Sequence, residues 1–129
     1  MKNNAFIFGS AFGLLAVILG AMGAHALKSH LSIEQLESFQ TGVRYQLFHA
    51  IMLFFIGSRI NSTSKSLNIV TNLFIIGTIL FSFSIYILST KALLGFDGLS
   101  ILGPITPLGG LLLISGWIIL LVESIRKKI

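Results

Sequence analysis

Six polar side chains stand in or beside long apolar segments of the chain, and their types could do chemistry. They are His25, Tyr45, His49, Ser82, Tyr86 and Thr106. Imidazole, phenol and hydroxyl groups donate and accept hydrogen bonds, and inside a membrane such groups cost free energy unless they find partners. The sequence therefore marks these six residues as a candidate polar pocket.

His49 leaves three interpretations open: it forms an interhelical hydrogen bond, it relays a proton or contacts a ligand, or it joins His25 in holding haem or a metal ion. The chain has no cysteine, and no carboxylate lies near the two histidines in the sequence. Two histidines alone make an incomplete metal site, so neither a metal nor a cofactor is predicted. Neither Ser82 nor Ser84 has an acid and a base at catalytic spacing, so no catalytic residue is predicted.

Three cations form a second candidate site, for lipid headgroups: Lys28, Arg44 and Lys91. A guanidinium fork holds a phosphate with two parallel hydrogen bonds, and lysines add positive charge beside it. Arg44 can instead extend along its helix to the membrane surface, or pair with Glu37 or Asp97. The sequence leaves these alternatives open.

The segments that carry these residues are strongly apolar. Hydrophobic residues make up 54% of the 129 residues and charged residues 10%, and the mean hydropathy is +0.94. This composition indicates an all-α membrane protein with no room for a separate soluble domain. The apolar runs occupy residues 5–22, 47–60, 67–88 and 108–122. A bundle of four transmembrane helices is therefore predicted, in one domain covering residues 1–129, with helices at residues 5–26, 33–60, 67–89 and 107–125.

Local signals set the starts of two of these helices. Residues 32–35, with the sequence SIEQ, fit a capping box, so the second helix should begin at Ile33. Thr106 followed by Pro107 fits an N-cap with proline at the first helical position. The last helix should therefore begin at Pro107.

The charges of the connections orient the chain. With four spans, six basic residues fall on the side of the termini and three on the other: Lys2, Arg59, Lys65, Arg126, Lys127 and Lys128 against Lys28, Arg44 and Lys91. An excess of Lys and Arg marks the cytoplasmic side, so both termini are predicted to be cytoplasmic, in a multi-pass protein of the cell membrane. Trp117 is expected to anchor the last helix at the inner surface. The net charge of +5 then lies at the membrane edges, which favours membrane lipids as partners rather than nucleic acid.

Small residues recur on narrow faces of the first and last helices. They are Gly9, Gly13, Ala16, Gly20 and Ala24 in the first helix, and Gly109, Gly110 and Gly116 in the last. Their spacing in the first helix suits close contact with another helix, in the same chain, in a homo-oligomer or in a membrane-protein partner. The sequence AHA at residues 24–26 also fits a signal-peptide cleavage site, but a discarded segment would not need this pattern.

Five short motifs together resemble one family of small membrane proteins. They are GAMGAHAL at residues 20–27, GVRYQLFHA at 42–50, FSFSIY at 81–86, ITPLGG at 105–110 and GW at 116–117. This set looks like the domain-of-unknown-function 423 family, whose animal relatives form the small transmembrane protein 256 group. The resemblance implies a four-span inner-membrane protein and no established activity. One departure is Phe83, where the family pattern more often has glycine.

Three classes of function remain. The scarcity of charge and the small-residue faces favour a structural or accessory membrane component. The alternative is a binder or carrier of a lipid or small solute, through an outward-facing polar pocket. An enzyme is the least favoured class, and no biochemical activity is predicted.

Overall fold

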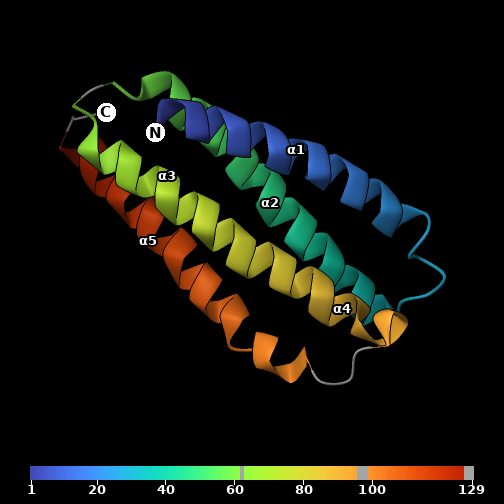
Figure 1. Ribbon diagram of the computed structural model, residues 1–129. Coiled ribbons are helices and arrows are strands. Elements are labelled where there is room, and N and C mark those ends of the chain that lie inside the picture. The colour runs from blue at the N-terminus through green and yellow to red at the C-terminus, as the bar shows by residue number, and fades with distance from the viewer. Residues whose placement is uncertain (62, 96–98, 127–129) are drawn as a thin grey trace.

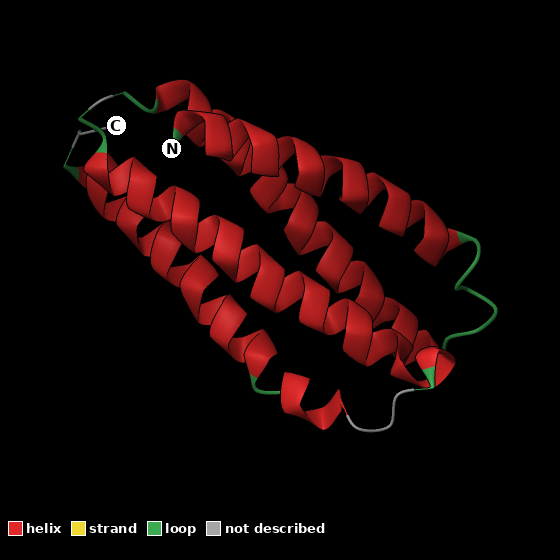
Figure 2. Ribbon diagram, in the orientation of Figure 1, coloured by secondary structure: helices red, strands yellow, loops and turns green. Residues whose placement is uncertain are grey.

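The computed structural model describes residues 1–61, 63–95 and 99–126. Its elements are α1 (Lys2–Ala24), α2 (Ile33–Arg59), α3 (Lys65–Thr78), a π-helix (Ile79–Phe83), α4 (Ser84–Leu94), a 3-10 helix (Leu99–Leu102) and α5 (Ile105–Ile125). Within the described ranges every regular element is a helix (Figure 2). Asp97, Lys127 and Lys128, which entered the sequence analysis, lie outside the described residues.

The long helices lie side by side along one axis (Figure 1). Both chain termini and the turn between α2 and α3 lie at one end, which we call the terminal end. The connection between α1 and α2 lies at the opposite end, which we call the loop end. α1 contacts mainly α2, and α5 contacts mainly α3 and the π-helix, while α2 joins these two pairs through α3 and α4.

The start of α2 is confirmed as a capping box. The Gln35 amide donates to the Ser32 hydroxyl at 3.1 Å, and the Ser32 amide donates to the Gln35 side-chain oxygen at 3.0 Å. These two bonds satisfy amides that the helix itself leaves unpaired. The helix begins at Ile33, as predicted.

The start of α5 differs from the prediction. The helix begins at Ile105, and Pro104 rather than Thr106 occupies the N-cap position. The fixed φ of Pro104, −67°, already suits helical backbone, so the helix can begin there without a side-chain cap. The Thr106 hydroxyl instead lies 2.6 Å from the Ser84 hydroxyl of α4.

A π-helix divides the third long helix, which runs over 30 residues from Lys65 to Leu94. A π turn adds a residue to the helical repeat and changes which backbone atoms face a neighbour. Gly109 of α5 lies directly against this segment, where a Cβ at Gly109 would be 2.8 Å from the Leu80 carbonyl carbon. The sequence predicted a continuous helix here, because nothing in the composition signals a π turn.

The small-residue face of α1 packs against α2. A Cβ at Gly9 would lie 3.1 Å from the Ala50 carbonyl oxygen, and one at Gly20 would lie 3.4 Å from a Val43 methyl. Gly23 continues this face and is buried, whereas Ala24 is exposed. The predicted face is therefore wrong at its last position: the contact continues with alternating steps of four and three residues, the spacing that keeps a helix facing a partner.

Among the described residues, three helices are long and apolar enough to cross a membrane: α1, the Lys65–Leu94 helix and α5. α2 is 27 residues long but does not reach the same mean hydropathy. The reason lies in its composition, because its first three turns are polar and its apolar half carries Gln46 and His49.

Candidate functional site

His49 is buried between three helices and bonded at both ring nitrogens. Its Nδ1 lies 2.7 Å from the Tyr45 carbonyl oxygen, and its Nε2 lies 3.2 Å from Nε1 of Trp117 on α5. Indole N–H only donates and a backbone carbonyl only accepts, so these two bonds define a neutral imidazole with its proton on Nδ1. The Phe74 ring packs edge-on against His49, with 4.9 Å between ring centroids.

This contact places Trp117 away from the membrane surface. Trp117 lies eight residues before the last residue of α5, about 12 Å along the helix axis from the terminal end, and bonds to His49 inside the bundle. The expectation that Trp117 anchors α5 at the inner surface is therefore wrong. Its indole N–H has a buried acceptor, so it needs no interfacial water.

Gln46 is the polar residue that the sequence analysis missed, and it is completely buried. Its Nε2 donates to the Phe12 carbonyl oxygen of α1 at 2.8 Å, and its Oε1 accepts from the Tyr86 hydroxyl of α4 at 2.7 Å. One side chain thus joins three helices. The signal in the sequence was a glutamine directly before an apolar run, three residues before His49 and on the same helical face.

Two serines make further interhelical contacts nearer the loop end. The Ser82 hydroxyl donates to the Gly42 carbonyl oxygen of α2 at 2.8 Å. Ser84 contacts Thr106 of α5 and also donates to carbonyl oxygens of its own helix. Ser82 therefore connects the π-helix to α2, and Ser84 connects α4 to α5.

The six residues of the predicted pocket do not converge on one cavity. His25 is exposed at the end of α1, 13 residues beyond Phe12, and so about 20 Å along the axis from the level of Gln46. This separation keeps His25 and His49 from sharing a metal or haem. Tyr45 is 43% exposed and turns outward from α2, with its ring against Phe81.

The three predicted headgroup cations do not form one cluster either. Lys28, Arg44 and Lys91 are all exposed. Arg44 donates to the Thr41 hydroxyl at 3.1 Å, which directs its guanidinium towards the loop end. The Tyr86 ring lies against Gly42, so Arg44 and Lys91 stand about 10 Å apart along the axis.

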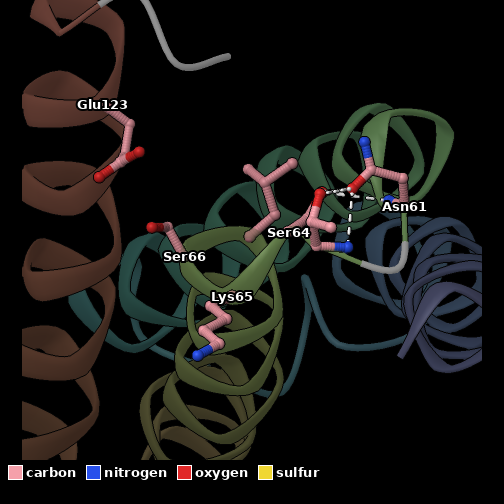
Figure 3. A pocket seen from close by; sticks show the side chains of 7 residues that line it. Asn61, Ser64, Lys65, Ser66 and Glu123 are labelled. Carbon is pink, nitrogen blue, oxygen red and sulfur yellow. Dashed lines mark hydrogen bonds between the residues drawn. The ribbon is translucent and has the colours of Figure 1, made fainter.

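A polar hollow of about 280 Å³ lies at the terminal end, beside the turn from α2 to α3 (Figure 3). The Asn61 side-chain oxygen accepts hydrogen bonds from the Thr63 amide and from the Thr63 and Ser64 hydroxyls. Lys65 and, from α5, Glu123 also line the hollow. The hydroxyls thus shape the turn, and among the described residues no three His, Asp or Glu side chains lie close enough to hold a metal ion.

Comparison with known proteins identifies the relatives of this chain. Residues 19–110 match the family described as a protein of unknown function, DUF423. The chain belongs to this family. The resemblance carried by the five sequence motifs is thereby confirmed.

The proteins most similar among those compared include membrane proteins of several bacteria. The UPF0382 membrane protein YwdK of Bacillus subtilis is 39% identical over 122 residues, which cover 93% of this chain and 94% of the relative. A UPF0382 membrane protein of Staphylococcus haemolyticus is 36% identical over 120 residues, 93% of each chain. One of Haemophilus influenzae is 33% identical over 128 residues, 99% of this chain and 98% of the relative. No solved structure matches the chain.

The similarity to membrane proteins and the long apolar helices together show that this chain is a small integral membrane protein. Phe83, which the sequence analysis marked as a departure from the family resemblance, carries a large ring into the bundle. This ring packs against Tyr86 and Phe12, with centroid distances of 5.7 and 6.4 Å. The close backbone approach in this part of the bundle occurs instead at Gly109.

Proposed function

We propose that this protein is a structural or accessory component of the cell membrane, built as one four-span domain over residues 1–129 with both termini in the cytoplasm. The observation that carries the proposal is that three buried polar side chains near the middle of the bundle bond to neighbouring helices. Gln46, His49 and Ser82 each reach across to another helix. Such bonds fix the packing of membrane helices and leave these groups little capacity for a solute.

The exposed face of α2 supports a fourth span. Between Tyr45 and Phe55 the exposed residues of α2 are aromatic or aliphatic, and Gln46 and His49 point into the bundle. The low mean hydropathy of α2 therefore comes from inward-facing residues and from its polar first turns, not from its lipid-facing surface. An even number of spans also agrees with both termini lying at one end (Figure 1).

The distribution of basic residues supports the orientation. Lys2, Arg59, Lys65 and Arg126 stand at the terminal end of the described chain, and Lys28 and Lys91 at the loop end. Because basic residues concentrate on the cytoplasmic side, we place the terminal end in the cytoplasm.

Single-cysteine labelling tests the topology, since the chain has no native cysteine. His30 and Thr63 are exposed and stand at opposite ends of the bundle. A membrane-impermeant maleimide should label His30→Cys on intact cells, and Thr63→Cys only after permeabilisation. Reversed labelling would contradict the orientation, and labelling of both from one side would contradict a spanning α2.

Native mass spectrometry of the gently extracted protein tests the accessory role. We expect a second copy of the chain or another membrane protein bound to it, as the exposed apolar helix faces allow. A bare monomer, with no partner recovered by crosslinking in cells either, would contradict the role.

A further inference from the structure

A groove open to the lipid runs between α2 and α5. At the terminal end it is a hollow of about 190 Å³ lined by Phe55, Ile56, Arg59, Leu67, Leu120 and Ser124. Towards the middle of the helices it is a hollow of about 450 Å³ lined by Tyr45, Phe48, His49, Ile51, Met52 and Trp117.

The two hollows follow one another along the same helix faces. On α2 the residues at positions 45, 49, 52, 56 and 59 recur with steps of four and three, and on α5 those at 117, 120 and 124 do the same. Within the described residues α2 and α5 make no close backbone contact. The His49–Trp117 hydrogen bond joins them across the gap. We call these two successive hollows together the α2–α5 groove.

The two ends of the groove differ in charge. Arg59 stands at the terminal end, exposed, with its guanidinium 5.5 Å from the centre of the Phe55 ring. Arg126, at the end of α5, adds a second cation at this end of the bundle. Glu123 is the nearby acid, but it lines the separate hollow beside Lys65. Below Arg59 the floor is apolar, formed by buried Ile56, Leu67 and Leu120.

The part of the groove between Arg59 and the His49–Trp117 hydrogen bond matches one leaflet of a membrane. From Arg59 to His49 is ten residues of helix, about 15 Å, which is half of a hydrocarbon core of about 30 Å. We propose that the α2–α5 groove binds one anionic phospholipid, with an acyl chain along the groove and the phosphate at Arg59. The binding itself does not depend on how the protein is oriented in the membrane. In the orientation proposed above, the terminal end faces the cytoplasm, so the bound lipid belongs to the inner leaflet.

The chemistry of the two ends fits this ligand. The guanidinium fork donates two parallel hydrogen bonds to a phosphate, and its contact with Phe55 holds it beside the groove before the lipid arrives. An anionic headgroup adds no positive charge next to Arg59 and Arg126, whereas a zwitterionic headgroup brings an ammonium group to the same place. The His49–Trp117 pair closes the apolar end near the middle of the membrane.

Lipid retention tests the proposal. The full-length protein is reconstituted in equal parts palmitoyl-oleoyl phosphatidylglycerol and phosphatidylethanolamine, extracted gently, and examined by native mass spectrometry. The wild type should retain one phosphatidylglycerol. Arg59→Gln should lower this retention about fivefold, the effect of one cation at a lipid headgroup. Arg59→Lys should lower it less, because charge remains but the fork is lost.

Ser124→Trp tests the acyl part of the site, because Ser124 is exposed on the rim and an indole there fills the groove without changing charge. It should also lower retention. Arg44→Gln is the matched control, an exposed arginine of the same helix outside the groove, and it should retain the lipid as the wild type does. Thermal unfolding checks that each variant is folded.

Equal retention by the wild type, Arg59→Gln and Ser124→Trp would overturn the proposal. Loss of lipid in Arg44→Gln with full retention in Arg59→Gln would also overturn it and would direct attention to the loop end. The topology and partner experiments above can fail without affecting this result, because they measure sidedness and assembly.

Discussion

The contact of α1 with α2 and the contact of α5 with the π-helix both contain glycine, but Gly13 and Gly109 face different atoms. In the α1–α2 contact, a Cβ at Gly13 would lie 4.0 Å from the Ala50 methyl, whereas one at Gly9 would come within 2.8 Å of a Phe54 ring carbon and 3.1 Å of the Ala50 carbonyl oxygen. In the contact of α5 with the π-helix, Gly109 faces the backbone of Leu80 and Phe81. A side chain can rotate away from a new methyl group, whereas the backbone of a packed helix cannot. The same residue type therefore tolerates an added methyl group to a different degree at the two contacts.

The hydrogen bonds between side chains and neighbouring helices also differ between these two contacts. The α1–α2 interface contains the Gln46 bond to the Phe12 carbonyl, near the middle of both helices. The described polar contact of α5 with the Lys65–Leu94 helix is Ser84 with Thr106, at the first turn of α5. The first contact thus combines a glycine with room beside it, Gly13, with a central hydrogen bond, and the second contains the close backbone approach at Gly109.

The largest effect should come from Gly109→Ala. We expect it to lower the free energy of unfolding by about 3 kcal/mol, because the methyl group overlaps backbone that has no room to shift. Reversible unfolding in mixed micelles measures this. Gly110→Ala is the matched control, since a Cβ there would lie 3.6 Å from Phe81, an ordinary contact. Equal effects of the two variants would remove the distinction between the interfaces.

His49→Ala should have the next largest effect, about 2 kcal/mol, because it removes the bond from Trp117 and leaves a void among aromatic rings. His49→Asn and His49→Gln should restore much of this loss by keeping a polar partner for the indole. The measurement is thermal stability of the detergent-solubilised variants. Equal damage from all three substitutions would contradict a role in joining α2 to α5.

Gln46→Leu should cost about 1.5 kcal/mol, since two interhelical bonds are lost while the apolar volume stays similar. Tyr86→Phe should cost about half as much, because it removes one of those bonds. The double variant should lose less than the sum, which a double-mutant cycle of unfolding free energies measures. Strict additivity would mean that the two side chains do not act through their shared bond.

Gly13→Ala should have the smallest effect. The methyl group meets only Ala50, and alanine favours helix over glycine by up to about 1 kcal/mol, so we expect no loss or a small gain in unfolding free energy. Gly9→Ala should fall between this variant and Gly109→Ala, because the exposed Phe54 ring can rotate but the Ala50 carbonyl oxygen, 3.1 Å from the new methyl group, belongs to helix backbone. A large loss in Gly13→Ala would contradict the room that the structure shows beside Gly13.

Much of the fold was readable in the sequence because the signals are local. The four helical regions follow from apolar runs, and the capping box at Ser32 fixed the start of α2 without any tertiary contact. The start of α5 was misjudged, because both Pro104 and Pro107 suit a first turn and only contact with Ser84 assigns another role to Thr106. Trp117 was misplaced because its acceptor, His49, lies 68 residues away in the chain.

The sequence identified the candidate polar residues by type, but it could not show which of them lie together in the fold. His25 and His49 both lie near apolar segments, yet the antiparallel register of α1 and α2 places them about 20 Å or more apart along the axis. Gln46 lies in one of the five family motifs, but its residue type and position alone did not indicate its partners. Its role becomes visible only where Phe12 and Tyr86 meet it from two other helices.

The sequence by itself determined that this chain is a helical membrane protein of one family, since hydrophobicity, capping and short motifs are properties of neighbouring residues. The tertiary structure alone decided which polar atoms bond to one another, where the π-helix meets Gly109, and that a groove with Arg59 at its mouth separates α2 from α5. The physical reason is that helix register and crossing geometry bring together atoms distant in the chain, and no local pattern encodes those distances.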